Sequence, residues 1–586
     1  NVSVDGGTIK LDGNYPVGLD NVALGDTALD SLTSGNFNTV FGAKALTANT
    51  EGSFNVGVGR LSLTSNTTGQ HNAGIGADAL QGNTTGSYNT ALGNGSLAYN
   101  TTANYNTAVG YAALFSNTTG TSLFAFGANT LRNNTTGNYN AAISGLYSNT
   151  TGSNNTALGM QALNANTTAS NNTAVGYQAG YANTTGADIT AIGYQALDSN
   201  TTGNYNTAIG LSALQSNTTA NSNTAVGRRA MFGNSTGGDN VGLGYHAMYS
   251  NTTGSSNVSI GKDALFSNTT ASNSTAVGYQ AAYSATTGGS NTAMGYRSLR
   301  SLTTGSGNTA LGKDSLYSST TAVYSTAVGH EALYQSTANL NTAVGFQSAR
   351  ATTSGTQNES LGASSLYTNT TGSYNVAIGR NSLYSNTTGL GNVAVGNLAL
   401  NSNTTASHNV GIGRDALRQN TTASNNTAVG YQAAYNNTTG AKNTALGYGA
   451  FPSNTTGGNN TAVGYSALQS NTTASNNTAI GFEAGFSNST GVENTYLGRN
   501  AGYYVTTGGK NTIVGAFHGN QGGLDIRTSS NNIVLSDGDG DPLMYLQHLG
   551  TNQWVLNANG AIVKAATSGR ECLSLQQNYG SGTQYF

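Results

Sequence analysis

Two carboxylates whose spacing could support catalysis are Asp314 and Glu331, which lie seventeen positions apart. If the chain returns to the same place at this interval, the two groups stand about 5 Å apart, near the carboxylate separation of a retaining glycosidase. Arg297 precedes Asp314 by the same interval, and Lys313 and His330 directly precede the two acids. A ladder of surface charges explains the same five residues, and we favour this interpretation over catalysis.

Tyrosines recur at the same spacing and could bind sugars, because a flat ring can stack on a sugar while its hydroxyl forms hydrogen bonds. One set directly follows a recurring glycine, and a second set lies further along, at the fifth position after that glycine. From the first set we take as possible glycan-stacking residues Tyr177, Tyr194, Tyr279, Tyr296, Tyr431, Tyr448 and Tyr465. The alternative, which we favour, is that these rings cover the edges of a repeat structure or its subunit contacts.

The residue pattern gives little support for a metal site or for a catalytic nucleophile. The six histidines do not gather with one another or with the single cysteine, Cys572, as zinc ligands would. The segment 537–541, Asp-Gly-Asp-Gly-Asp, could present carboxylates to calcium, but it lacks the later Glu of a calcium loop and is better explained as a tight turn. No Ser-His-Asp grouping occurs at local spacing. We therefore expect no catalytic residue, no cofactor and no metal.

Asn-Thr-Thr and Asn-Ser-Thr triplets, such as those at Asn117, Asn251 and Asn437, match the acceptor pattern for N-glycosylation. The same residue types suit a tight turn, since Asn tolerates a left-handed backbone. We favour the turn interpretation, because a turn requires these residue types in any case.

Apart from Cys572, His548 and the segment 537–541, these residues belong to a seventeen-residue repeat that runs about thirty times along the chain. Its core reads Asn-Thr-Ala-[Val/Ile/Leu]-Gly, then a short turn, Ala-Leu and Asn-Thr-Thr-[Gly/Ala]. We number positions within a repeat from this glycine, which is position 0. The spacing shortens twice, to fifteen positions between Ser144 and Gly159 and to sixteen between Gly329 and Gly345. A short, fixed period over this length predicts a solenoid of similar coils rather than a globular enzyme.

The residue types within one repeat predict strands. Seventeen residues cannot hold two helices and a turn, and Val, Ile and Thr next to Gly and Asn favour a short strand with tight turns. The apolar residue at −1 and the leucine at +4 are expected to form two internal columns. The small residues at −2 and 0 would then lie on the opposite face, as a packing surface between chains. Asn at −4 is expected to stack on itself as an amide ladder.

Composition argues against two kinds of partner. Charged residues make up 7% of the chain and the formal net charge is −2, without a run of Lys or Arg, so nucleic acid is not expected. No stretch is apolar for long enough to span a bilayer, so membrane insertion is not expected either.

The segment 172–179, Asn-Thr-Ala-Val-Gly-Tyr-Gln-Ala, resembles the head repeats of YadA-like trimeric autotransporter adhesins. Such repeats build a left-handed parallel β-roll that forms trimers, so the resemblance implies a homotrimer. The repeats of that family are usually a few residues shorter, and the longer Asn-Thr-Thr-Gly turn is the difference.

The flanks of the array resemble those of phage tail fibres. Segment 7–16, Gly-Thr-Ile-Lys-Leu-Asp-Gly-Asn-Tyr-Pro, is similar to their lead-in, and segment 530–554 is similar to a stretch near their C-terminus. We therefore divide the chain into an N-terminal attachment or capping segment (1–20), a repeat shaft (21–519) and a β-rich C-terminal cap or trimerisation module (520–586).

Together, the pattern and the resemblance predict an all-β fold: a parallel β-solenoid or β-roll of about thirty 17-residue coils, in a trimeric fibre with a small β-rich C-terminal module. The resemblance implies a structural and adhesive phage tail fibre, located in the virion, with tail or baseplate proteins and a host-surface glycan or protein receptor as partners. One alternative is a bacterial cell-surface adhesin or extracellular filament subunit. Another is a tailspike glycan hydrolase, which would use Asp314 and Glu331.

Overall fold

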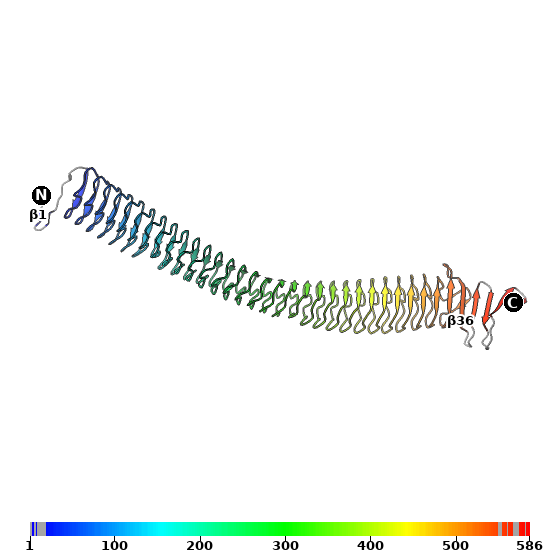
Figure 1. Ribbon diagram of the computed structural model, residues 1–586. Helices are drawn as coiled ribbons and strands as arrows, with labels where there is room; N and C mark the ends of the chain where they lie inside the picture. Colours follow the sequence, from blue (N-terminus) through cyan, green and yellow to red (C-terminus); the bar gives the residue numbers. More distant parts are fainter. Residues whose placement is uncertain are drawn as a thin grey trace. The chain divides into compact units, whose positions relative to one another are not determined.

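The computed structural model describes residues 3–4, 7–8, 19–548, 554–558, 561–565, 573–579 and 582–585. Within these ranges the chain forms strands and turns and no helix. It divides into two units, unit 1 (residues 1–291) and unit 2 (residues 292–586), and each is described by itself. In each unit the strands stack in chain order (Figure 1).

Unit 1 is a parallel β-solenoid preceded by a short hairpin, in which β1 (Ser3–Val4) pairs antiparallel with β2 (Gly7–Thr8). Short strands follow, and each pairs in parallel and in register with the next, as β8 does with β9. Their bounds are β3 Val22–Leu24, β4 Thr39–Phe41, β5 Val56–Val58, β6 Ala73–Ile75, β7 Thr90–Leu92, β8 Thr107–Val109, β9 Phe124–Phe126, β10 Ala141–Ile143, β11 Thr156–Leu158, β12 Thr173–Val175, β13 Thr190–Ile192, β14 Thr207–Ile209, β15 Thr224–Val226, β16 Val241–Leu243, β17 Val258–Ile260 and β18 Thr275–Val277.

Unit 2 continues the same pattern of short parallel strands. Their bounds are β19 Thr292–Met294, β20 Thr309–Leu311, β21 Thr326–Val328, β22 Thr342–Val344, β23 Glu359–Leu361, β24 Val376–Ile378, β25 Val393–Val395, β26 Val410–Ile412, β27 Thr427–Val429, β28 Thr444–Leu446, β29 Thr461–Val463, β30 Thr478–Ile480, β31 Thr495–Leu497 and β32 Thr512–Val514. The parallel β-solenoid of about thirty coils predicted from the repeat is therefore confirmed.

The last strands of unit 2 change from parallel to antiparallel pairing. Strand β35 pairs in parallel with β32, and from β35 onwards each strand pairs antiparallel with the next. A small hairpin, β33 and β34, lies in the loop between β32 and β35. The bounds are β33 Asn520–Gln521, β34 Leu524–Asp525, β35 Ile533–Ser536, β36 Pro542–His548, β37 Trp554–Ala558, β38 Ala561–Ala565, β39 Leu573–Tyr579 and β40 Gly582–Tyr585. Cys572 lies outside the described residues.

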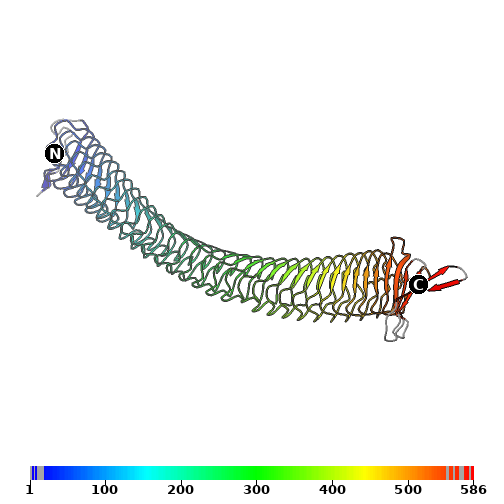
Figure 2. The same cartoon turned by 45° about the vertical axis from the view of Figure 1, so that its right-hand side comes forward.

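Each coil is a narrow loop with its strand along one side (Figure 2). The coil 106–122 illustrates the turns, which rely on four residues with positive φ: Gly110 (134°), Ala112 (53°), Leu114 (54°) and Ser122 (58°). Position 0 is glycine for a second reason, because a Cβ on Gly110 would lie 2.5 Å from the carbonyl oxygen of the next marker glycine. Neighbouring coils therefore approach each other too closely at this point to admit a side chain.

Backbone hydrogen bonds join neighbouring coils around the whole loop and not only at the strands. Beyond strand β8, the N–H of Leu114 donates to the carbonyl of Thr130 at 3.0 Å. In the Asn-Thr-Thr turn, both the N–H and the hydroxyl of Thr118 donate to the carbonyl of Thr135, at 2.9 and 3.0 Å. The turns are consequently as regular from coil to coil as the strands are.

The interior contains the leucine at +4 and the alanine at −2. Leu97, Leu114 and Leu333 are fully buried, which confirms the internal column predicted at +4. Position −2 faces the +4 leucine of the preceding coil, since a Cβ on Gly411 would lie 3.2 Å from Leu400 Cγ. Ala108 at −2 is likewise fully buried.

The prediction that the apolar residue at −1 faces the interior is wrong. Leu92, Leu158 and Leu361 at this position are 45%, 44% and 49% exposed. Because neighbouring residues of a strand point to opposite faces, the small residues at −2, which we had placed on an outer packing surface, point inward instead. The reason is the narrowness of the loop: the +4 leucine fills the space behind the strand and leaves room only for a small side chain there.

Two columns of asparagine run through the interior. At −4, the backbone N–H of Asn72 donates to Asn55 Oδ1 of the preceding coil at 2.9 Å, which confirms the predicted ladder. At +7, the first residue of the Asn-Thr-Thr triplet, Asn66 Nδ2 donates to Asn49 Oδ1 at 2.8 Å. Unit 2 repeats both patterns. The second ladder was not predicted, because the triplet could be explained by turn chemistry alone.

Candidate functional site

The seven tyrosines predicted as glycan-stacking residues lie at position +1, on the outer surface of their coils. In unit 1, Tyr177 and Tyr194 stack with ring centroids 5.4 Å apart. In unit 2, Tyr431, Tyr448 and Tyr465 form one stack with centroid distances of 5.0 and 5.4 Å. Rings at this spacing cover each other's faces, so such a column presents mainly ring edges and hydroxyl groups to solvent.

The remaining two tyrosines of this set lie beside basic side chains. In unit 1, Lys262 Nζ lies 5.7 Å from the centre of the Tyr279 ring. In unit 2, Arg297 Cζ lies 4.8 Å from the centre of the Tyr296 ring. Both distances are within the range of cation–π attraction. The glycan-stacking role of the whole set stays a prediction.

A longer aromatic stack, which we did not predict, lies at position −5 in unit 1. Its rings follow one another at centroid distances between 4.7 and 5.1 Å: Phe37, Phe54, His71, Tyr88 and Tyr105. These residues recur at a constant spacing of one repeat, which would have been enough to predict the stack. The column was overlooked because the aromatic residue type changes along it.

The residues at −1 form what we call the apolar outer column. Its exposed members in unit 1 are Phe41, Ile75, Leu92, Phe126, Ile143, Leu158, Ile192, Ile209 and Val226. Those in unit 2 are Met294, Leu311, Leu361, Ile378, Ile412, Leu446, Ile480, Leu497 and Val514. The −3 residue of each strand, most often Thr, lies on the same face. Among these outward strand positions in β3–β32, only Glu359 is charged.

The carboxylates considered for catalysis are each bound by an arginine. Arg297 forms a bidentate pair with Asp314, with Nε–Oδ1 at 2.9 Å and Nη2–Oδ2 at 3.2 Å. Glu331 Oε2 accepts hydrogen bonds from Arg350 Nε at 2.7 Å and from Gln347 Nε2 at 2.8 Å. The pair of Arg297 with Asp314 belongs to the charge ladder that we favoured, whereas Glu331 pairs with Arg350, which the prediction did not include.

The electrostatics of Glu331 oppose a role as proton donor. Partial burial works to raise the pKa of Glu331, but the hydrogen bonds from Arg350 and Gln347 and the positive charge of Arg350 outweigh it, so the pKa lies below its ordinary value. A glycosidase acid needs a raised pKa, so that it carries a proton at neutral pH.

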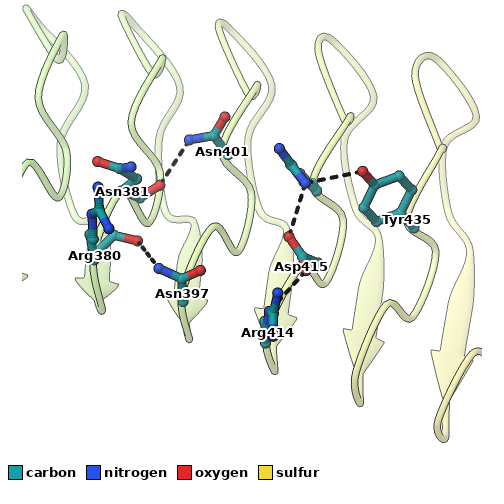
Figure 3. A network of polar contacts seen from close by, with 8 residues as sticks. Arg380, Asn381, Asn397, Asn401, Arg414, Asp415 and Tyr435 are labelled. Atoms are coloured by element: carbon teal, nitrogen blue, oxygen red, sulfur yellow. Dashed lines mark hydrogen bonds and ion pairs between the residues drawn. The ribbon is translucent and has the colours of Figure 1, made fainter.

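A third acid at +2, Asp415, shows the same pairing (Figure 3). Its two oxygens lie 3.3 Å from Arg414 Nε and 3.3 Å from Arg418 Nη1, and Arg418 Nη1 also donates to the Tyr435 hydroxyl at 3.1 Å. In the same view, Asn397 Nδ2 donates to a backbone carbonyl of an earlier coil at 3.3 Å. The two arginines belong to the same coil as Asp415, and Arg418 joins this cluster to Tyr435 of the next coil, which explains the acid at +2 without invoking a substrate.

Within the described residues, no three His, Cys, Asp or Glu side chains gather as metal ligands. His246 Nδ1 lies 3.5 Å from Asp263 Oδ1, and burial lowers the pKa of His246 despite this neighbour. In the segment 537–541, Asp537 Oδ1 accepts hydrogen bonds from the N–H groups of Asp539 and Asp541 at 3.1 and 2.9 Å. This carboxylate therefore stabilises the turn between β35 and β36, as the turn interpretation requires.

The triplet asparagines are buried in the solenoid. Asn117, Asn251 and Asn437 have no solvent-exposed surface, and the Nδ2 of each donates a hydrogen bond to the asparagine one coil earlier. Attachment of a sugar at Nδ2 would break these bonds and could not be accommodated inside the coil. The structure thus favours the turn interpretation and adds a ladder to it.

Comparisons with protein-family models, with curated proteins and with solved structures found no match for the chain. The part of the chain that the structure describes contains no helix that could cross a membrane.

Proposed function

We propose that this chain is the shaft of a structural, adhesive fibre, in the first instance a phage tail fibre, in which three copies pack through the strand face of their coils. The observation that carries the proposal is the apolar outer column, since Leu158 and Leu361 are exposed on a face with almost no charge. Exposed apolar surface of this extent is typical of interaction sites.

A second copy of the same chain is the partner that suits this face. The face repeats with every coil, as the in-register pairing of β23 with β24 illustrates. Only a partner with the same period can match it coil after coil. Three copies are the number that the resemblance to trimeric adhesin repeats implies, and closed symmetry would cover the apolar face of each copy.

The biological role follows from this assembly. We propose that the fibre is carried by a virion, is anchored to tail or baseplate proteins, and binds a glycan or protein on the host surface with three-fold avidity. The same shaft would also serve a bacterial surface adhesin, and the location of the native protein, in virions or on cells, separates the two. Glycan hydrolysis is not favoured, because arginines bind Asp314 and Glu331 and the pKa of Glu331 is lowered.

Light scattering of the purified chain tests the assembly. One chain has a mass of 59.2 kDa, and the trimer is expected at three times that mass. A variant with Leu361→Arg and Ile378→Arg is expected to fall to the monomer mass, because it places charges on the apolar outer column. Ala363→Arg is the control, since position +1 already holds Arg380 and Arg414 in other coils. A wild-type monomer with a native β-sheet circular dichroism spectrum would contradict the proposal.

Adhesion is tested separately with fluorescently labelled full-length chain applied to a panel of bacterial strains. Retention of the trimer after washing, on some strains and not on others, is the expected result. A trimer that is retained on no strain and is absent from purified virions would refute the attachment role, whatever its mass.

A further inference from the structure

The short coil of unit 1 interrupts two outer columns. Between Ile143 and Leu146 there are only Ser144 and Gly145, where other coils have four residues. Leu146 is fully buried at the +4 position, and the N–H of Ser144 donates to the carbonyl of Phe126, as the residue at 0 does elsewhere. Ser144 therefore replaces the residues at 0, +1 and +2, so this coil contributes nothing to the +1 and +2 columns.

The missing residues leave a cavity of about 470 Å³ on the outer surface of unit 1. Ala128 and Asn129 of the preceding coil line one side, and Met160 and Gln161 of the following coil line the other. Ile143 lies in the wall between them. The volume lies in the range of ligand-binding sites in proteins.

A chain of glutamine amides at +2 ends at this cavity. Gln195 Nε2 donates to Gln178 Oε1 at 2.9 Å, and Gln178 Nε2 donates to Gln161 Oε1 at 2.9 Å. Gln215, at +5 of the next coil, extends the chain by donating from Nε2 to Gln195 Oε1. Each amide in the run donates toward the preceding coil. Gln161 is the last, and the coil before it has no side chain at +2 to accept its amide hydrogens. The side-chain amide of Gln161 therefore faces the cavity as a hydrogen-bond donor. Its carbonyl already accepts a hydrogen bond from Gln178, and this bond strengthens the amide as a donor.

The other polar groups of the cavity are also neutral. Asn129 and Asn164 line it, and their side chains make no hydrogen bond within the described residues. Tyr147 lines it as well, and its hydroxyl accepts a hydrogen bond from Arg132 Nη1 at 3.2 Å, which leaves the hydroxyl hydrogen for an acceptor. No lining residue is charged, so the cavity is matched to a neutral ligand rather than an ion.

The cavity has the shape of one missing layer of side chains, which we call the missing rung: the +1 and +2 side chains that the coil at Ser144 lacks. Side chains at +1 on successive coils stack about one ring apart, as Tyr177 and Tyr194 do at 5.4 Å, and Met160 precedes Tyr177 in this column. Removal of one rung between Ala128 and Met160 leaves space for a single flat ring. Exposed Met160 offers apolar surface, and the amides offer donors and acceptors around it.

We propose that this cavity binds a neutral pyranose sugar, which takes the place of the missing rung. Its C–H face packs on Met160, and its hydroxyls exchange hydrogen bonds with Gln161, Asn129 and Asn164. The proposal rests on the proposed function, because it names the receptor chemistry that the fibre would recognise. It differs from the tyrosine columns, whose ring faces are already covered.

Saturation-transfer NMR and calorimetry on the full-length chain test the site, with the methyl β-glycosides of glucose, galactose and N-acetylglucosamine as probes. The first variant replaces Ser144-Gly145 by Gly-Tyr-Gln-Ala, the sequence at 176–179, which restores a coil of the usual length and fills the cavity. The second is Gln161→Leu, with Gln432→Leu as its control, since Gln432 occupies the same +2 position in unit 2.

The wild type and Gln432→Leu are expected to bind at least one probe in the millimolar range, whereas Gln161→Leu weakens binding about tenfold and the filled variant abolishes it. Equal binding by the wild type and the filled variant, or no binding by the wild type, would overturn the site. The trimer mass of the filled variant is measured in parallel. If the wild type is a trimer and binds no probe, only this sugar site is refuted. If the wild type is a monomer, the proposed fibre is refuted.

Discussion

Asn117 Nδ2 donates a hydrogen bond to Asn100 Oδ1, one coil earlier in the chain, at 2.9 Å. The same amide nitrogen donates to the carbonyl of Gly120 within its own turn, and Asn117 Oδ1 accepts from Asn134 Nδ2 of the next coil, both at 2.9 Å. All three asparagines are fully buried. Each side chain in this ladder therefore orders its own turn and also connects two neighbours.

Asn117→Asp is expected to destabilise unit 1 by about 3 kcal/mol or more, because a buried carboxylate would face the oxygens of Asn100 and Gly120. Asn117→Leu is the matched comparison and should cost less, about 1 kcal/mol, since Leu302 occupies the same +7 position in unit 2. Urea denaturation followed by circular dichroism measures both. Equal costs would show that the ladder does not depend on amide donors.

Leu97→Ala and Leu92→Ala test which side of the coil faces the interior. Leu97 at +4 is fully buried and Leu92 at −1 is 45% exposed. Truncating Leu97 is expected to cost about 2–5 kcal/mol in unfolding free energy, and truncating Leu92 under about 1 kcal/mol in a monomeric sample. In a trimeric sample Leu92→Ala should also lower the association constant. A larger cost at Leu92 than at Leu97 in the monomer would reverse our assignment of the faces.

Gly176→Ala is expected to open the array locally. Gly176 has φ 132°, and a Cβ there would lie 2.5 Å from the carbonyl oxygen of Gly193. Gly95 also has positive φ, 66°, but its nearest neighbour to a Cβ is 3.4 Å away, and Gln178 occupies the same +2 position with φ 53°. Hydrogen exchange should therefore accelerate around residue 176 in the first variant and stay unchanged in Gly95→Gln.

Tyr496 occupies an interior position that is alanine in most coils. Its ring lies where the +4 side chains of two coils would be, and both of these residues, Gly485 and Gly502, are glycines. A Cβ on Gly485 would lie 2.6 Å from Tyr496 Cδ2. The hydroxyl has no hydrogen-bond partner within the described residues, and burial raises the pKa of Tyr496.

Tyr496→Phe is accordingly expected to stabilise unit 2 by about 1 kcal/mol, because it removes an unpartnered buried hydroxyl. Tyr496→Ala alone should cost about 3–5 kcal/mol. Combining it with Gly485→Leu and Gly502→Leu restores the usual packing and should recover most of that loss. Denaturation midpoints of the three proteins measure this coupling, and additive losses would contradict it.

The pair of Glu331 with Arg350 predicts a pH dependence. The pKa of Glu331 is lowered in the folded state, so the pair stabilises above the ordinary pKa of a glutamate and loses its effect as the pH falls through the lowered value. Arg350→Met should cost about 1 kcal/mol at pH 7 and less once Glu331 is protonated, when the contact of Arg350 Cζ with the Tyr334 ring, 5.0 Å away, is still lost. Arg499→Met is the control, as Arg499 forms no ion pair within the described residues. A cost that is the same at both pH values would rule out the ion pair as its source.

The constant period of the repeat was enough to predict the parallel solenoid, its +4 core column and the −4 asparagine ladder. It could not decide which of two neighbouring strand residues faces inward. Alternation fixes that Ala108 and Val109 lie on opposite faces, but the side is set by the width of the loop, in which Leu97 and its equivalents fill the space behind the strand. A thicker coil would have admitted valine on the inside.

The candidate sites were predicted in part. Recurrence placed Tyr177 and Tyr194 in one column, but only the structure shows that their faces are covered by stacking. The short spacing between Ser144 and Gly159 was visible in the sequence, yet its effect depends on which positions are lost. Because +1 and +2 are outward positions, their loss produces a cavity at the surface and leaves the core continuous.

The near-identity of successive coils has a genetic consequence. Most coils offer the same donors to one neighbour and the same acceptors to the other, so the in-frame gain or loss of the codons for one such repeat joins surfaces that already match. Shaft length can therefore change in one recombination event between repeats, without compensating mutations elsewhere. A lineage carrying such a gene can adjust its reach across generations while every retained segment keeps its shape.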